Sequence, residues 1–138
     1  MAGLNNVKAK TRDSKRLQDI KQLQIAIQLY LEQNGVYPPS NAGNWSGASA
    51  GCGAAWYTNN GATYIGGLVA GNFMSVLPRD PKEDTCNLYI YMSNGTDYKL
   101  LVHQTLETFD PVTTNHPLKD PGNRQYSFAI YSPGGSGW

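Results

Sequence analysis

The sequence predicts an α+β fold in which a long N-terminal helix packs on a small antiparallel sheet of about three strands, with a long loop and a short helix between them. Residues 5–34 contain neither Gly nor Pro and carry apolar residues at three- and four-residue steps, which is the period of an amphipathic helix. Further along, two runs of aromatic and aliphatic residues flank Asn94-Gly95, a dipeptide that favours a tight hairpin turn.

With 138 residues, the chain can build one core but not a second. We therefore expect a single domain over residues 1–138, with a helical stem at 5–34, a loop region with the short helix at 35–87, and the sheet with a C-terminal loop at 88–138. Fifteen Gly, eight Pro and nine Tyr indicate a loop-rich protein with half-buried aromatic residues, a composition that suits an extracellular module.

The expected stem helix is apolar on one face in its second half and polar in its first half. The apolar face consists of Ile20, Leu23, Ile27, Tyr30 and Leu31. At about 1.5 Å per residue such a helix extends roughly 45 Å, which is longer than a domain of this size needs. Residues 7–17 are nearly all charged or small, so we expect that part of the helix to project from the body.

The segment after the helix is predicted to be mostly loop. Asn34-Gly35 is a helix stop, because Gly readily adopts the left-handed conformation just past a C-cap. Residues 40–61 are rich in Gly, Ser and Asn and predict a long surface loop. Residues 63–73 carry apolar residues at helical spacing despite three glycines, and the proline-rich segment 77–81 then ends the pattern, which predicts the short helix.

Three segments have the composition of β-strands. Residues 88–92 and 98–104 are rich in β-branched, aromatic and aliphatic residues and flank the hairpin turn. Residues 126–131 alternate well enough for a third strand, and Pro133-Gly134 ends it. The order predicted along the chain is therefore helix first and sheet second.

Charge is distributed unevenly along the chain. The first 21 residues hold six Lys or Arg and two Asp, whereas the remainder sums to minus three. A basic block can face nucleic acid or anionic lipid, but a solvated helix face explains it better, and nucleic acid is not implied. The sequence contains no apolar run near the roughly 20 residues that span a bilayer. Met1-Ala2-Gly3 is typical of an expression start placed before a helix already in progress, so we expect the natural protein to have a further segment there.

The two cysteines, Cys52 and Cys86, belong to no CxxC pair and have no histidine at ligand spacing, so a metal site is not favoured. In an exported protein we expect them to form a disulfide, which would contribute about 3 to 4 kcal/mol. A reduced, buried pair in a cytosolic protein is the alternative.

Several segments, in order, resemble the type IV pilin and type II secretion pseudopilin superfamily. Residues 9–24 with the exit at 34–38 look like the exposed half of the pilin N-terminal helix. Residues 68–81, ending in Leu-Pro-Arg-Asp-Pro, are similar to its short helix and stop, and residues 89–107 resemble its central hairpin. The resemblance implies a pilin-like fold and a structural subunit of a type IV pilus-like filament on the bacterial surface, serving adhesion, motility or DNA uptake.

The resemblance also implies partners and processing. The natural protein would be cleaved by a prepilin peptidase, methylated at its new N-terminus, and anchored in the membrane by an apolar helical segment that this sequence lacks. Its partners would be copies of itself or related pilins, and the inner-membrane assembly machinery. The C-terminal turn at 132–138 lacks the acidic calcium loop of the major pseudopilins, which favours a pilin. A pseudopilin of a type II secretion system and a monomeric surface adhesion or binding module are the alternatives.

Assembly residues are expected in the basic stretch of the helix. In a filament, Arg12, Lys15 and Arg16 would meet acidic residues of a neighbouring subunit's globular domain. Surface ion pairs are each worth about 0 to 1 kcal/mol, so these contacts should set the register between subunits more than the strength of the contact.

Catalysis and metal binding have little support in the sequence, and no catalytic residue is assigned. His103 and His116 belong to no recognisable motif. Calcium is the one cofactor considered, with the oxygens of Asp110, Asn115 and Asp120 as candidate ligands, although Asp-Pro pairs are explained equally well as turn formers. Four aromatic residues could form a glycan-binding or partner surface, but such residues more often fix a glycine-rich loop to the body. These four are Trp45, Trp56, Tyr57 and Trp138.

Overall fold

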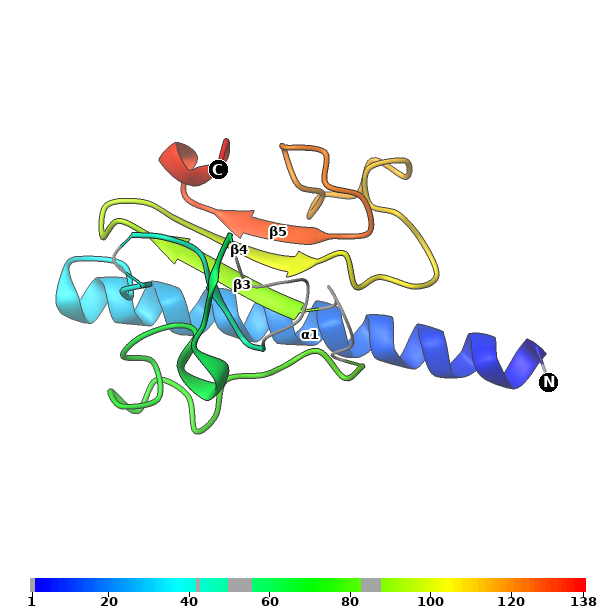
Figure 1. Ribbon diagram of the computed structural model, residues 1–138, viewed down its shortest axis with the longest axis horizontal. Coiled ribbons are helices and arrows are strands. Elements are labelled where there is room, and N and C mark those ends of the chain that lie inside the picture. Colours follow the sequence, from blue (N-terminus) through cyan, green and yellow to red (C-terminus); the bar gives the residue numbers. More distant parts are fainter. Residues whose placement is uncertain (1, 42, 50–55, 83–87) are drawn as a thin grey trace.

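The computed structural model describes residues 2–41, 43–49, 56–82 and 88–138, and consists of one long helix packed on a five-stranded mixed sheet (Figure 1). The predicted α+β class is confirmed, although the number of strands is higher than predicted. The elements are α1 (Ala2–Asn34), β1 (Ser46–Gly47), β2 (Thr58–Asn59), β3 (Leu88–Ser93), β4 (Tyr98–His103) and β5 (Phe128–Tyr131), with 3-10 helices η1 (Gly61–Thr63) and η2 (Pro133–Gly135).

The predicted hairpin forms the centre of the sheet. Strands β3 and β4 pair antiparallel over their full length, from Leu88 opposite His103 to Ser93 opposite Tyr98, and β5 pairs antiparallel with β4. In the connecting turn Gly95 has a φ of +89°, which a residue with a side chain rarely adopts. The side chain of Asn94 accepts hydrogen bonds from the amides of Thr96 and Asp97.

Two short strands lie within the region predicted to be loop. Strand β1 pairs antiparallel with β3 and parallel with β2, which gives the sheet order β2-β1-β3-β4-β5. Composition does not reveal them, because each strand has only two residues and includes Gly or Asn, which are depleted in strands. A tertiary contact holds them instead: the ring of Tyr57 lies against the α-carbon of Gly47, where any side chain would clash.

The short helix expected over residues 63–73 is instead η1 followed by a series of turns. Gly67 has a φ of +82° and Asn72 a φ of +61°, and both values interrupt a right-handed helix. The apolar residues of the segment still reach the core, since Tyr64, Ile65 and Leu68 are buried. Helical spacing therefore identified the buried side chains correctly, but the positive φ angles of Gly67 and Asn72 prevent a continuous helix.

The core lies between one face of α1 and the sheet. Ile20, Leu23 and Ile27 of the helix are fully buried, as the sequence predicts. The sheet contributes Tyr89, Tyr91, Tyr98, Leu100, Val102, Phe128 and Ile130. A smaller cluster covers the opposite face of the sheet, where Tyr57 and Trp45 pack on Leu88, Ile90, Leu101 and Ala129.

The N-terminal end of α1 extends past the body, as Figure 1 shows. From Gly3 to Thr11 every residue except Ala9 is exposed. The prediction that residues 7–17 project is wrong beyond Thr11, because Asp13 and Arg16 are buried. Charged side chains can be buried when they are paired and hydrogen-bonded, and this polar half of the helix is held to the body in that way.

Candidate functional site

A buried ion cluster, consisting of Arg12, Asp13, Arg16, Asp80 and Glu107, fixes the middle of α1 to the body. Arg16 is at its centre and its side chain is 0% exposed. Its Nε and Nη2 donate to the two carboxylate oxygens of Asp80 at 2.7 and 3.0 Å. Its Nη1 donates to Asp13 at 2.9 Å and to Glu107 at 2.7 Å. Paired oxygens of this kind match the planar fork of a guanidinium.

The other members of the ion cluster anchor the turn that follows β4. Asp13 accepts hydrogen bonds from the backbone amides of Glu107 and Thr108 and from the Thr108 hydroxyl. Arg12 donates from Nε and Nη2 to both oxygens of Glu107, each at 2.6 Å. The helix is thus joined to two distant segments, one around Asp80 and one at residues 107–108.

The ion cluster favours the charged forms of Arg16 and Glu107. Hydrogen bonding from Arg12, with a smaller contribution from Arg16, lowers the pKa of Glu107 to about 2 despite partial burial. Burial opposes the charge of Arg16, but hydrogen bonds to Asp80, Glu107 and Asp13 outweigh it and raise the guanidinium pKa above its ordinary value. Mutual stabilisation of this kind is lost when one partner is removed.

The three predicted assembly residues all have partners within the chain. Arg12 and Arg16 belong to the ion cluster, and Lys15 donates to both oxygens of Asp19 at 3.0 and 2.8 Å while its side chain stays 49% exposed. Asp19 also accepts a hydrogen bond from the hydroxyl of Tyr89. Arg16 has no exposed surface to offer a neighbour, so its predicted contact with another subunit has no support in the geometry. The assembly role of Arg12 and Lys15 stays a prediction.

The face of α1 that points away from the body carries a continuous uncharged surface, which we call the outward stripe. At 3.6 residues per turn, its members lie within about 80° of one another and nearly opposite the buried Ile20, Leu23 and Ile27. All eight are exposed, and none of the nine charged residues of α1 is among them. The outward stripe consists of Leu4, Val7, Thr11, Ser14, Gln18, Gln22, Ile25 and Leu29.

Both ends of the outward stripe are apolar. Leu4 and Val7 on the overhang, and Ile25 and Leu29 over the body, have between 48 and 63% of their surface exposed. Single exposed apolar residues need no explanation, but four aligned on one helix face indicate a surface that another molecule covers. The three- and four-residue steps along the stripe are those of helices that pack side by side.

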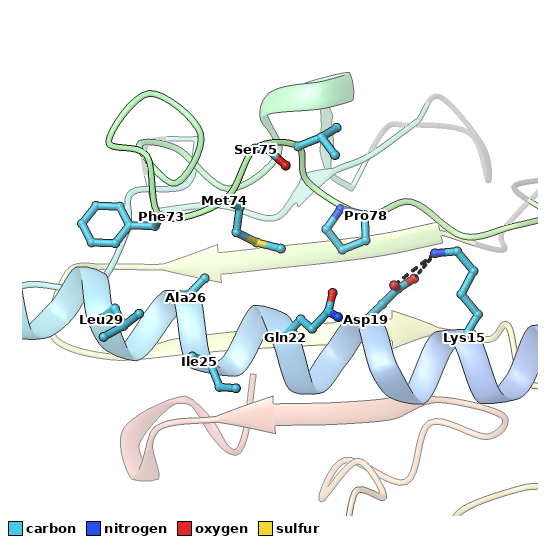
Figure 2. Close-up of a pocket in the computed structure, with 11 residues that line it drawn as sticks. Lys15, Asp19, Gln22, Ile25, Ala26, Leu29, Phe73, Met74, Ser75 and Pro78 are labelled. Atoms are coloured by element: carbon cyan, nitrogen blue, oxygen red, sulfur yellow. Dashed lines mark hydrogen bonds and ion pairs between the residues drawn. The ribbon is translucent and has the colours of Figure 1, made fainter.

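A groove runs beside the body end of the outward stripe. It lies between α1 and the loop 73–78, has a volume of about 520 Å³, and is lined by Ile25, Leu29, Phe73, Met74 and Val76 among others. Figure 2 shows Phe73, Met74 and Pro78 on the loop across from the helix, with Asp19 and Lys15 paired at one end. Val76 is 65% exposed, so the wall of the groove is apolar up to its rim.

A second buried ion pair closes the C-terminal turn over the outer face of the sheet. Lys99 of β4 and Asp120 have side chains that are 0% exposed, and their Nζ and Oδ1 atoms lie 2.6 Å apart. The same ammonium group donates to the main-chain oxygens of Ser136 and Trp138 at 2.9 and 2.8 Å. Burial raises the pKa of Asp120, but hydrogen bonds from Lys99, Gly122 and Arg124 outweigh it and leave the pKa below its ordinary value.

The three candidate calcium ligands act as turn residues. Asp110 accepts hydrogen bonds from the amides of Val112 and Tyr126, and Asp120 from the amides of Gly122 and Arg124. Asn115, at a φ of +52°, accepts from the ammonium of Lys119. Within the described ranges, no group of three or more His, Cys, Asp or Glu side chains is arranged to hold a metal ion. Of the two sequence interpretations, these contacts support turn formation.

The aromatic residues mainly fix the loop, as the sequence suggests. Tyr57 is buried on the outer face of the sheet, and the ring of Trp45 lies under the guanidinium of Arg124 at 5.9 Å. Trp56 is 42% exposed and packs between the rings of Tyr57 and His103. His116 stacks with Phe109 and Phe128 and accepts a hydrogen bond from the amide of Leu118 at Nδ1, which is a structural role.

No family model, curated protein or solved structure matches the chain. The resemblance to pilins therefore stays an interpretation of the residues, and function has to be argued from the surfaces described above. In the part of the chain that the structure describes, no helix is both long enough and apolar enough to cross a membrane. Cys52 and Cys86 lie outside the described residues, so the predicted disulfide stays a prediction.

Sequence reasoning missed two features of this site. The ion cluster had a local signal, because Asp13 and Arg16 are three residues apart on one helix face, but nothing in the sequence identifies Asp80 and Glu107 as the partners. The outward stripe was visible as a run of uncharged positions at three- and four-residue steps. It was missed because its four middle members are Thr, Ser and Gln, which an apolar pattern does not include.

Proposed function

We propose that this chain is the globular part of a structural subunit of a type IV pilus-like filament on the bacterial surface, and that it catalyses no reaction. The observation that carries the proposal is the outward stripe, which continues from the free overhang of α1 onto the body. A protein that acts alone gains nothing from a helix that extends beyond its core, because an isolated helix of ten residues is marginal in water. In a filament, neighbouring subunits would cover the overhang and the stripe.

The ion cluster supports the same proposal. It holds α1 against the body from residue 12 onward, so a neighbour that covers and orders the overhang takes a fixed orientation to the domain. Head-to-tail contacts that do not close into a ring propagate as a helical polymer. In this proposal the partners are other pilin-type subunits and the inner-membrane assembly machinery, and the membrane is reached only through an apolar helical segment ahead of α1, as the resemblance implies.

The test joins such an apolar pilin segment to α1, in cells that also make other pilin-type subunits, and counts surface filaments by electron microscopy. Val7→Asp with Ile25→Asp places two charges on the outward stripe and should abolish the filaments at normal subunit levels, since burying an unpaired carboxylate is costly. The matched control is Asn6→Asp with Gln24→Asp, two exposed residues away from the stripe, which should keep the filaments. Filaments that persist in the stripe variant would remove the outward stripe as the contact surface, whereas the absence of filaments from the unsubstituted fusion would overturn the proposal and favour a monomeric adhesion or binding module.

A further inference from the structure

We infer that the outward stripe binds the helix of a different, acid-flanked subunit and not the α1 helix of a second copy of this chain. This inference rests on the proposed filament function and goes beyond it by naming the chemistry of the neighbour. It follows from the charges that border the stripe and from the places where the acidic residues of the chain lie.

Lysines border the outward stripe on both sides. Lys8 and Lys15 lie on one flank and Lys10 and Lys21 on the other, about 55 to 85° from its centre, and all four are exposed. Residues in these positions face the flanks of a partner helix that packs on the stripe, as at the edges of a coiled-coil seam. A partner with the same sequence would present lysine to lysine.

The exposed surface of α1 has almost no carboxylate to offer in return. Of its three acidic residues, Asp13 and Asp19 are buried and paired, and only Glu32 near the C-terminal end is exposed. Elsewhere in the described ranges Asp80, Asp110 and Asp120 are also buried, Glu107 is paired with Arg12, and the half-buried Asp97 accepts a hydrogen bond from the Ser132 hydroxyl. Like charges placed opposite each other disfavour a contact, so two α1 helices of this chain repel along the stripe.

The composition of the outward stripe favours a helix over a lipid surface as the partner. A helix that lies on a membrane needs a contiguous apolar face, whereas the middle of the stripe is polar at Thr11, Ser14, Gln18 and Gln22. Small and amide side chains suit helix packing, because they allow close approach and can hydrogen-bond across the contact.

The groove supplies a socket at one end of this contact. Ile25 and Leu29 belong both to the outward stripe and to the lining of the groove, whose other wall includes Phe73, Met74 and Val76. Its volume of about 520 Å³ accommodates large apolar side chains from a helix lying along the stripe. The partner helix should therefore carry acidic flanks along its length and bulky apolar residues where it passes the groove.

The experiment uses this chain and an acid-flanked version of it, Lys8→Glu with Lys10→Glu and Lys21→Glu, as the probe for such a neighbour. These three lysines are exposed, and Lys15 is left unchanged because it pairs with Asp19. In sedimentation velocity at about 20 mM salt, each protein alone should be monomeric and an equimolar mixture should form a one-to-one complex. At about 300 mM salt, where charges are screened beyond a few ångströms, the affinity should fall at least about tenfold.

A third variant distinguishes binding through the outward stripe from attraction between oppositely charged proteins. The acid-flanked chain with Val7→Asp and Ile25→Asp is more negative still, yet it should bind the wild-type chain at least about tenfold more weakly, because the stripe is interrupted. Equal or tighter binding by this chain, the absence of any complex in the mixture, or self-association of the wild-type chain would each overturn the inference.

Two further outcomes separate this inference from the filament proposal. Filaments assembled from the wild-type subunit alone would overturn the acidic neighbour and leave the filament function standing. A mixed complex that gives no filaments under any condition would support the acidic neighbour and overturn the filament function. Finally, the wild-type chain should bind phosphatidylcholine vesicles that contain phosphatidylglycerol more weakly than it binds the acid-flanked chain. Tighter binding to the vesicles would assign the lysine-bordered stripe to a membrane surface.

Discussion

Arg16 and Asp80, 64 residues apart in sequence, form a two-fold hydrogen-bonded ion pair in which neither side chain is exposed. This pair connects the polar half of α1 to the loop that precedes β3, and it adds to the apolar contacts of Ile20, Leu23 and Ile27 in holding the helix. A buried pair of this kind is a poor source of net stability, but removal of one partner strands the other charge.

We predict that Arg16→Met lowers the free energy of unfolding by about 3 to 5 kcal/mol, because the buried Asp80 and Asp13 would lose their bonds to the Arg16 guanidinium. Urea unfolding followed by circular dichroism measures the change. Lys21→Met, an exposed position on the same helix, is the control and should change stability by less than about 0.5 kcal/mol. A loss below about 1 kcal/mol in Arg16→Met would mean that water reaches the cluster.

Acid should destabilise the protein through Glu107. Because the folded state lowers the pKa of this carboxyl from 4.5 to about 2, its contribution to stability is complete above about pH 5 and is lost as the pH falls towards 2. We predict a loss on the order of 3 kcal/mol over this range, measured by urea unfolding at a series of pH values. Glu107→Gln should flatten that dependence, whereas Glu32→Gln, at an exposed site, should keep it. An unchanged slope in Glu107→Gln would contradict the prediction.

The C-terminal turn should depend on Lys99. Lys99→Met is expected to cost roughly 3 kcal/mol, because it leaves Asp120 buried without its closest cation, and to accelerate hydrogen exchange in residues 132–138. The double variant Lys99→Met with Asp120→Asn should recover part of the loss, since it removes the stranded charge. Lys119→Met is the matched control, because the Lys119 ammonium donates a hydrogen bond to the exposed side chain of Asn115. Unaltered exchange in Lys99→Met would show that the turn is held by other contacts.

We also predict a disulfide between Cys52 and Cys86, which would close a loop of 34 residues and stabilise the protein by about 3 to 4 kcal/mol. Alkylation followed by mass measurement, with and without reductant, decides it. Two alkylated thiols in the unreduced protein would support the reduced, cytosolic alternative.

Elements with a clear period were predictable from the sequence, and elements that depend on distant partners were not. The buried face of Ile20, Leu23 and Ile27 and the hairpin around Gly95 follow from local patterns, so they were predicted correctly. Strands β1 and β2 depend on contacts between distant residues, the pairing of β1 with β3 and the approach of the Tyr57 ring to Gly47, which no window of a few residues can reveal. The same is true of Arg16, whose burial depends on Asp80 and Glu107 arriving from two other segments.

The predicted assembly residues also have partners that the sequence does not reveal. Arg12, Lys15 and Arg16 were expected at a surface because charged residues usually are. Paired charges are the exception to that rule, and a helix half with few apolar residues is where such an exception should be sought. A reversal of all three charges would therefore test folding as much as assembly, which is why the experiments above change Lys8, Lys10 and Lys21 instead.

The bare overhang of α1 gives the helix a gradient of local stability. Its first turns, up to Thr11, are exposed except at Ala9, so they should open and close more readily than the rest, while amides around Ile20 and Leu23 should exchange only when the whole domain unfolds. In such a subunit the first turns of α1 become fully ordered only when a partner covers them. The conformational entropy lost at that step lowers the affinity of the contact. Binding of a partner to this helix is thus coupled to the folding of its first turns.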